Sequence, residues 1–336
     1  MNFAIIGTGM ISHIHAEVIQ SLDGHHLTWV HSRNERYGAD FARKYGCKHS
    51  TDLEMLLMAS DIDAVAICTP SGTHAELIIQ AAQHHKHVLV EKPLDIALEQ
   101  ADEAIQVCKE NGVKLGVIFQ LRFMEETKKA KRILEEGLLG ALIEVDTYMK
   151  FYRPETYYEN SSWKGKQELD GGGALMNQGI HGIDLLLWLA GSVSSVTAQV
   201  KTLKHAIEVE DTAAAIVNFA NGAMGIIQGT TSIYPDHPQL LTFHGTKGTL
   251  ELAGTEVPYI RTLHIQDRPE LTINHPAVPV DHLGEAHKQQ YIDFIEAIEQ
   301  DRQPLVNGAE GRKSLQLVKS IYQSSLERRT VEVPQR

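Results

Sequence analysis

The chain has 336 residues, of which 43% are hydrophobic and 22% are charged, and its formal net charge is −12. This length favours two domains, and the acidic balance argues against binding to the phosphates of nucleic acids. Three widely spaced cysteines favour a reducing compartment over a disulfide framework. The first apolar run begins at Phe3, too early for a signal peptide, and no apolar stretch is long enough to span a bilayer. We therefore expect a cytoplasmic protein without a membrane partner.

The first third of the chain alternates short apolar runs with amphipathic segments. The runs that we predict as strands are 3–6, 27–30, 64–68, 87–90 and 114–119. The segments that we predict as helices are 11–22, 36–45, 73–84 and 98–111. Strands without polar alternation, separated by helices, are typical of a parallel sheet covered on both faces. We predict a Rossmann domain over residues 1–120.

The pattern changes after Arg122. A helix is expected at 125–136, followed by a strand at 143–151, a loop at 152–173 and a helix at 174–189. The later predicted strands are 196–203, 212–219, 224–232, 240–244 and 249–252, and the last predicted helices are 285–300 and 311–328. Turn signals between the strands favour antiparallel pairing. Residues 121–336 are therefore predicted to form an α/β domain on a large, open, mostly antiparallel sheet.

The segment from Gly7 to Ser12 lies between the first predicted strand and the first helix. Gly7 permits a tight turn, and Gly9 allows backbone amides to approach a pyrophosphate at the start of the helix, where Met10 and Ile11 follow. Ser12 replaces the third glycine of the usual dinucleotide pattern and is small enough for close packing. This strand–turn–helix context predicts NAD(P) binding.

The end of the second strand bears on the choice between NAD and NADP. A carboxylate that binds the ribose is expected there, but the chain has Ser32 followed by Arg33. Because a guanidinium suits a 2′-phosphate, we favour NADP over NAD. The alternative is that Arg33 is a solvated charge and that either cofactor is accepted.

Three further segments carry a family resemblance. Residues 68–74 read Cys-Thr-Pro-Ser-Gly-Thr-His, residues 90–94 read Val-Glu-Lys-Pro-Leu, and residues 170–184 run from Asp-Gly-Gly-Gly to His181-Gly-Ile-Asp. With the glycine turn, they resemble the glucose–fructose oxidoreductase / inositol dehydrogenase / rhizopine-catabolism (Gfo/Idh/MocA) family. The resemblance covers essentially the whole chain. It implies a homodimer or homotetramer assembled through the C-terminal sheet.

The resemblance also implies roles for residues of the first domain. Thr69, Pro70 and His74 would line the cofactor, and Glu91 and Lys92 would lie where cofactor and substrate meet. A cis peptide before Pro93 is frequent in the family. Lys92 follows a parallel strand, where ligands bind, and burial would lower its pKa enough for proton exchange. The alternative is that Lys92 only neutralises Glu91 or holds the cofactor.

In the second domain, the spacing of Asn177, His181 and Asp184 predicts three polar side chains on one helical face. The resemblance implies that His181 transfers a proton to the substrate or donates a hydrogen bond. Many members carry Asp where this chain has Asn177, which favours a scheme centred on Lys92. Further candidates for substrate contact are Gln120, Arg122, Trp163 and Asp184.

These observations favour an NAD(P)-dependent oxidoreductase that transfers a hydride to or from a secondary alcohol of a cyclic polyol, a sugar or a sugar derivative. The alternative is a non-catalytic NAD(P)-binding regulator or scaffold, which is favoured only by Asn177 at the position where many family members carry Asp. We predict no metal site. His13 and His15 are two residues apart on a predicted helix and do not share a face, and the histidines at 84, 85 and 87 have no clear set of acidic or thiolate ligands nearby.

Overall fold

The computed structural model describes residues 1–254, 257–274 and 283–334, and the chain divides into two compact units. The first unit contains residues 1–120 and 284–312, and the second contains residues 121–283 and 313–336. Within the described ranges, no helix is both long enough and apolar enough to cross a membrane.

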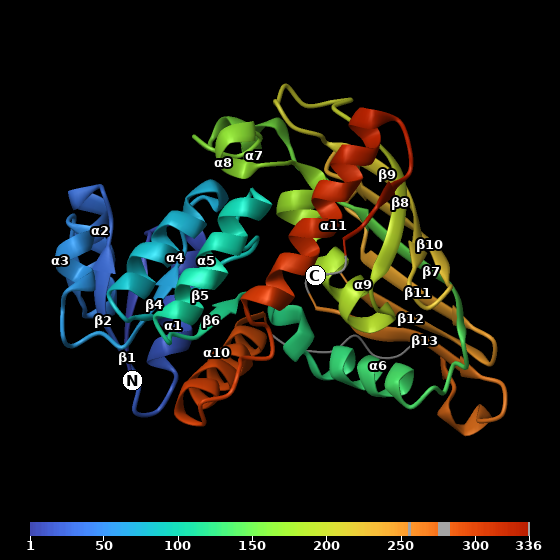
Figure 1. Cartoon of the computed structure of the whole chain (residues 1–336), viewed down its shortest axis with the longest axis horizontal. Helices are drawn as coiled ribbons and strands as arrows, with labels where there is room; N and C mark the ends of the chain where they lie inside the picture. The colour runs from blue at the N-terminus through green and yellow to red at the C-terminus, as the bar shows by residue number, and fades with distance from the viewer. Residues whose placement is uncertain (255–256, 275–282, 335–336) are drawn as a thin grey trace. The chain divides into compact units, whose positions relative to one another are not determined.

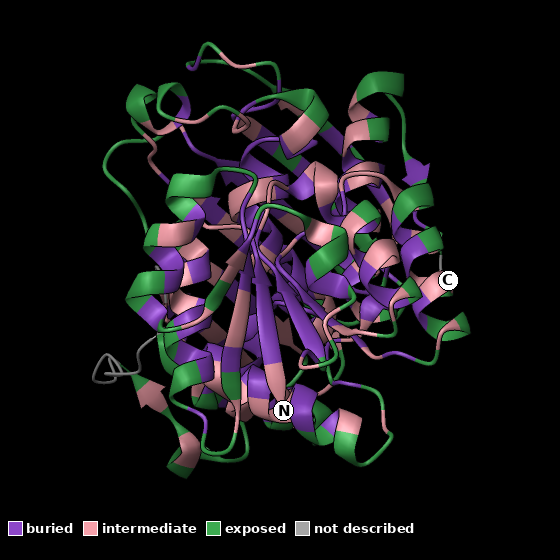
Figure 2. Ribbon diagram, turned by 90° about the vertical axis from the view of Figure 1, so that its left-hand side faces the viewer, coloured by how far each residue is buried: buried purple, intermediate pink, exposed green. Residues whose placement is uncertain are grey.

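A six-stranded parallel sheet forms the centre of the first unit (Figure 1). Its strands are β1 (Asn2–Ile6), β2 (His26–His31), β3 (Lys48–Ser50), β4 (Ala64–Ile67), β5 (His87–Val90) and β6 (Leu115–Val117). The strand order β3-β2-β1-β4-β5-β6 reverses direction beside β1, which is the position where this fold binds dinucleotides. The strands β1, β4, β5 and β6 are buried along most of their length, as expected for a sheet covered on both faces, whereas β2 and β3 are only partly buried (Figure 2). The predicted Rossmann sheet is thus confirmed.

Helices cover both faces of this sheet. They are α1 (Met10–Gln20), α2 (Glu35–Tyr45), α3 (Leu53–Leu57), α4 (His74–Gln83), α5 (Leu98–Glu110) and α10 (Leu283–Glu299). The sequence predicts that residues 121–336 form one domain, whereas residues 284–312, which include most of α10, belong to the first unit. The physical reason is apolar contact, because Tyr291 and Phe294 are buried in one core with Phe3.

The second unit is built on a nine-stranded sheet. Its strands are β7 (Leu142–Lys150), β8 (Val193–Lys201), β9 (Thr212–Phe219), β10 (Met224–Thr230), β11 (Gln239–Gly245), β12 (Gly248–Gly254), β13 (Tyr259–Ile265), β14 (Ile273–Asn274) and β15 (Val331–Glu332). They are arranged in the order β14-β13-β12-β11-β7-β10-β9-β8-β15. All neighbours pair antiparallel except β7 and β10, which are parallel. The mostly antiparallel sheet that the sequence predicts is therefore confirmed.

Helices pack on one face of the nine-stranded sheet (Figure 1). They include α6 (Glu125–Glu135), which contacts β12 and β13, and α9 (Ile180–Ala190), which contacts β7 and β11. The short helices α7 (Glu155–Glu159) and α8 (Gln167–Asp170) lie in the segment predicted as a loop, and α11 (Gly308–Glu327) begins in the first unit and continues in the second. Along β9, buried and exposed residues alternate, so one face of the sheet is open.

Candidate active site

The glycine turn after β1 has the backbone geometry that a dinucleotide site requires. Gly7 has a φ of +108°, and a Cβ there would lie 2.6 Å from the carbonyl oxygen of Cys68. Gly9 precedes α1 with an ordinary φ of −74°, and a Cβ there would meet nothing within 4 Å. Ser12 is fully buried, and its hydroxyl donates to the carbonyl of Gly9. The turn therefore leaves open space in front of a helix N-terminus, which fits a pyrophosphate.

The end of β2 presents a hydroxyl followed by a cation. Ser32 is buried, and its hydroxyl lies 3.2 Å from the hydroxyl of Thr8 in the glycine turn. The backbone amide of Asn34 also donates to Ser32, at 3.3 Å. Arg33, which lies between Ser32 and Asn34 in the chain, is exposed. Ser32 thus belongs to the same loop assembly as the glycine turn, and Arg33 is accessible to a ligand phosphate.

His74 joins the loop after β4 to the segment after β5. Its Nδ1 lies 2.7 Å from the carbonyl oxygen of Pro93, and its Nε2 lies 3.0 Å from that of Thr69. The ring is almost completely buried, and burial lowers the pKa of His74. A neutral imidazole has one N–H and can donate to only one of these carbonyls. His74 therefore supports the loop of Thr69 and Pro70 from behind, and a direct contact of its ring with a cofactor stays a prediction.

Lys92 follows β5 in the middle of a tightly held segment. The peptide bond between Lys92 and Pro93 is cis, as the family resemblance implies. Glu91 is buried, and its Oε2 accepts the backbone N–H of Lys92 at 3.2 Å. Lys92 follows β5, which pairs with β4, and β4 in turn pairs with β1. Lys92, the Thr69 loop and the glycine turn therefore share the carboxyl edge of one parallel sheet.

In the second unit, the predicted helix 174–189 begins differently from the prediction. Residues 174–179 form a π-helical turn, and only the following α9 is regular. The spacing that predicted one polar face for Asn177, His181 and Asp184 holds only for an α-helix, and Asn177 lies in the π-helical turn. The three side chains also differ in exposure, because Asp184 is buried whereas Asn177 and His181 are half-buried. Turns of this type recur at functional sites in proteins.

Asp170 supplies a carboxylate beside Asn177, a contact that the sequence analysis missed. The Asn177 side chain donates to Asp170 Oδ1 at 2.7 Å, and its own oxygen accepts from the Gln178 side chain at 2.9 Å. The other oxygen of Asp170 accepts the backbone N–H of Gly165 at 2.8 Å. The signal in the sequence was an acidic residue directly before three glycines. The amide at 177 is therefore oriented by a buried carboxylate seven residues earlier.

Glu210 holds the start of the π-helical turn and was also missed. Its two carboxylate oxygens accept the backbone N–H groups of Gly173 and Leu175, at 2.8 and 2.9 Å. The Tyr322 hydroxyl donates to Glu210 at 2.8 Å. Burial raises the pKa of Glu210, and these hydrogen bonds oppose the shift. Nothing in the local sequence around residue 210 shows that its side chain reaches residues 173–175.

Arg122 and Asp184 form a buried, two-point ion pair. The guanidinium donates at 2.8 and 2.7 Å to the two carboxylate oxygens, and each residue is 1% exposed. The Ser314 hydroxyl adds a contact to Asp184 at 3.3 Å. This geometry ties α9 to the segment before α6. Contact of either side chain with a substrate, which the sequence analysis predicted, stays a prediction.

Gln120 and Trp163 are placed in different units. Gln120 is buried at the end of the first unit, and Trp163 is half-buried in the second. Next to Trp163, the Lys164 amine lies 3.8 Å from the centre of the Tyr157 ring. Arg153 lies over the same ring and donates to the Gln178 side chain at 2.6 Å. The segment around Trp163 therefore brings cations and aromatic rings to the residues beside Asn177.

The fold and the glycine turn define the chain as a dinucleotide-binding protein. Residues 1–119 match the oxidoreductase family with an NAD-binding Rossmann fold, and residues 127–251 match the GFO/IDH/MocA C-terminal domain. The chain belongs to the Gfo/Idh/MocA family of NAD(P)-dependent oxidoreductases, as its motifs indicate.

The chain is similar to named dehydrogenases over about three quarters of its length or more. The structure is similar to that of the WlbA dehydrogenase from Bordetella pertussis in complex with NADH and UDP-GlcNAcA, with a TM-score of 0.90 and 33% identity over 100% of this chain and 99% of that one. The chain is 26% identical to the myo-inositol 2-dehydrogenase of Thermotoga maritima, over 99% of this chain and 98% of the relative. It is 30% identical to the NAD⁺-dependent scyllo-inositol 2-dehydrogenase of Bacillus subtilis, over 74% and 72% of the two chains.

Proposed function

We propose that this protein transfers a hydride between a nicotinamide dinucleotide and a secondary alcohol of a sugar-like ring, with Lys92 as the group that exchanges the proton. The observation that carries the proposal is the carboxyl edge of the parallel sheet. The glycine turn after β1, the Thr69 loop after β4 and Lys92 after β5 follow three adjacent strands. Ligands of open α/β sheets bind at this edge.

The bound nicotinamide supplies the hydride acceptor or donor. Gly7, Gly9 and the first amides of α1 hold the pyrophosphate, and Thr69 and Pro70 line the cofactor beside Lys92. When an alcohol is oxidised, the Lys92 amine takes the hydroxyl proton, and in the reverse direction its ammonium returns it. In the second unit, His181 and Asn177 bind and orient the substrate hydroxyls, and Asp170 fixes the amide of Asn177.

We propose further that NADP is bound in preference to NAD. The support is the absence of a carboxylate at residues 32–34, together with the exposed guanidinium of Arg33 at the end of β2. The relative from Bordetella pertussis was solved with NADH, which makes NAD the alternative cofactor. Direct titration with both cofactors decides between them.

For the substrate we propose an acidic nucleotide sugar, and cyclic polyols are the second choice. The Bordetella pertussis protein, which is similar over the full length of the chain, binds UDP-GlcNAcA. In this chain, Arg153 and Lys164 lie over the ring of Tyr157, and Arg153 reaches Gln178 next to Asn177. Cations on aromatic faces suit a ligand that carries carboxylate and phosphate groups. The inositol dehydrogenases among the relatives support the second choice.

We also propose that copies of the chain assemble through the open face of the nine-stranded sheet. The large apolar residues Ile216 and Met224 are 51% and 53% exposed on β9 and β10. These strands are neighbours, and their register, which pairs Met224 with Asn218 and Ile226 with Ile216, puts both side chains on the same face of the sheet.

The test is a steady-state assay with NAD⁺ and NADP⁺ against UDP-GlcNAcA, myo-inositol and scyllo-inositol, followed at the absorbance of the reduced nicotinamide. We expect turnover that the Lys92→Ala variant loses by at least about a hundredfold, with cofactor affinity changed less than about threefold. Lys109→Ala, which removes an exposed lysine of α5, is the control and should behave like wild type. Tight cofactor binding without turnover on any substrate would favour the non-catalytic regulator.

A further inference from the structure

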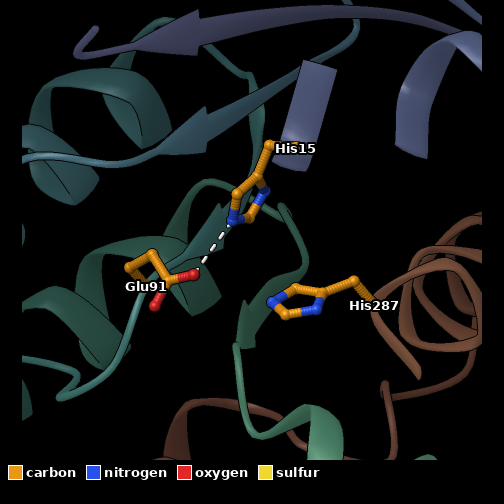
Figure 3. A group of neighbouring side chains, drawn as sticks. All are labelled: His15, Glu91 and His287. Carbon is orange, nitrogen blue, oxygen red and sulfur yellow. Dashed lines mark hydrogen bonds and ion pairs between the residues drawn. The ribbon is translucent and has the colours of Figure 1, made fainter. Parts of the chain in front are cut away.

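Three buried side chains from separate elements of the first unit meet in one cluster (Figure 3), and one of them, Glu91, directly precedes Lys92 in the chain. They are His15 of α1, Glu91 after β5 and His287 of α10, which are 0%, 7% and 1% exposed. One ligand atom of each lies within 4.8 Å of the others. The cofactor-binding functions described above use neither histidine.

Both nitrogens of His15 are engaged. Nε2 lies 2.9 Å from Glu91 Oε1, and Nδ1 lies 2.7 Å from the Tyr291 hydroxyl. An ionised carboxylate only accepts hydrogen bonds, so Nε2 must donate to Glu91. The Tyr291 hydroxyl, which is itself buried, holds the other edge of the ring. The imidazole therefore has one orientation, aimed at the carboxylate.

The same carboxylate also accepts a hydrogen bond from the backbone of Lys92, whose side chain carries the proposed catalytic amine. Glu91 Oε1 is bound to His15, and Glu91 Oε2 accepts the backbone N–H of Lys92 at 3.2 Å. His15 lies in the helix that begins at the glycine turn. One side chain therefore links the cofactor-binding helix to the backbone of Lys92.

The charge state of the pair follows from its neighbours. Burial alone lowers the pKa of His15, but contacts with Cys68, Tyr291 and Glu91 outweigh it and hold the pKa well above 6.5. Burial alone raises the pKa of Glu91, but His15, His287 and Lys92 outweigh it and lower the pKa to about 2. The titratable groups that surround His15 and its partner Glu91 are Cys68, His74, Lys92, His287 and Tyr291.

A buried ion pair contributes little net stability, because desolvation offsets the attraction between its charges. Well-packed apolar residues could fill the same space. This pair is hydrogen-bonded to the backbone N–H of Lys92, so its position suits a role in the site rather than in stability. The Glu91 carboxylate also interacts electrostatically with the Lys92 amine, whose protonation state matters for proton exchange.

We propose that His15 is a positioning residue for Lys92: the imidazolium, held by Tyr291, fixes the Glu91 carboxylate on the Lys92 amide and balances its charge next to the Lys92 amine. The inference rests on the proposed function, in which Lys92 exchanges the proton. Without the imidazolium, the carboxylate charge is uncompensated and favours the protonated amine.

The test measures the Lys92 amine directly, without turnover. The full-length protein is labelled with acetic anhydride over a range of pH, and the modification of Lys92 is quantified by mass spectrometry. Only the neutral amine reacts, so the midpoint reports its pKa. We expect His15→Phe to move the midpoint upward by about one pH unit, the effect of one nearby charge in a protein. In the activity assay, kcat should fall about 10- to 100-fold, with little change in the KM for the cofactor.

His13→Phe is the matched control, because His13 lies on the same helix and its Nδ1 also contacts a tyrosine hydroxyl, that of Tyr45 at 2.8 Å. This variant should keep the Lys92 midpoint and kcat of wild type. If His15→Phe does not fold, His15→Gln replaces it, since the amide can donate to Glu91 but carries no charge. It should shift the midpoint in the same direction.

Two results would overturn the inference. One is an unchanged Lys92 midpoint in a folded His15 variant. The other is one equivalent of tightly bound zinc in the wild-type protein that His287→Phe loses, which would make the cluster a metal site. If the wild-type protein turns over no substrate, the proposed function fails, and the labelling curves still decide the role of His15.

Discussion

Gly9→Ala separates cofactor binding from folding at the glycine turn. The backbone of Gly9 has a φ of −74° and a ψ of −177°, which alanine adopts without strain, and the added Cβ would meet nothing within 4 Å. Gly9 also precedes α1, where alanine is a slightly poorer cap, while alanine lowers the entropy of the unfolded chain. These effects oppose each other, so the free energy of unfolding should change by less than about 1 kcal/mol.

The same methyl group would occupy the space through which a pyrophosphate approaches the amides of α1. Loss of one hydrogen bond to a charged group costs about 1.5–3 kcal/mol, which weakens binding by about 10- to 100-fold. Calorimetric titration with NADP⁺ and NAD⁺ measures the affinity, and thermal unfolding measures the stability.

Two variants serve as controls for Gly9→Ala. Gly284→Ala, in α10, also places a Cβ in open space and should leave affinity unchanged while raising the free energy of unfolding by no more than about 1 kcal/mol. Gly7→Ala should instead destabilise the fold by about 2 kcal/mol or more, because of its positive φ and the nearby Cys68 carbonyl. Wild-type affinity in a folded Gly9→Ala protein would refute the placement of the pyrophosphate.

Four further predictions concern other parts of the chain. Arg33→Asp should weaken NADP⁺ at least about tenfold more than NAD⁺ in calorimetric titrations, and equal losses would contradict the 2′-phosphate assignment. Asp184→Asn should lower the unfolding free energy in urea by about 3–5 kcal/mol, because it leaves the Arg122 guanidinium buried without its charged partner; a loss below about 1 kcal/mol would show that the pair is dispensable. The pKa of Glu91 is lowered from 4.5 to about 2, so the ionised carboxylate contributes its full stabilisation above pH 4.5 and loses it as the pH falls from 4.5 to about 2. In Glu91→Gln, the free energy of unfolding should therefore fall less steeply between pH 4.5 and about 2 than in the wild-type protein. The same pH dependence in both proteins would show that Glu91 does not cause the loss of stability in acid. Ile216→Lys on β9 should shift the protein towards monomers in analytical ultracentrifugation, and an unchanged assembly would place the interface elsewhere.

Local patterns in the sequence accounted for much of the first unit. Uniformly apolar strands and the glycine turn predicted the parallel sheet and its cofactor edge, because both depend on short-range rules. The strands β3, β14 and β15, of two or three residues each, were missed because such short segments contain no detectable period. The longer β13 was missed as well, because only its last four residues, Thr262–Ile265, alternate between polar and apolar.

The partners of the site residues could not be predicted from the sequence. Asp170 orients Asn177 from seven positions away, Glu210 binds the backbone of Gly173 and Leu175, and Arg122 pairs with Asp184. Each of these side chains can be recognised in the sequence as polar or charged, but only the folded chain shows which group each of them binds. The π-helical turn at residues 174–179 was equally hidden, because the amino-acid pattern there is that of an ordinary helix.

By itself, the sequence determined the family, the Rossmann topology and the likeness of Lys92 and His181 to catalytic residues, since motifs and periodicity are local properties of a chain. Only the tertiary structure decided that α10 completes the first core and that His15 binds the carboxylate next to Lys92. Those contacts join residues 76 and 276 positions apart. Burial of apolar faces and neutralisation of buried charges select such pairs, and both are properties of the packed molecule.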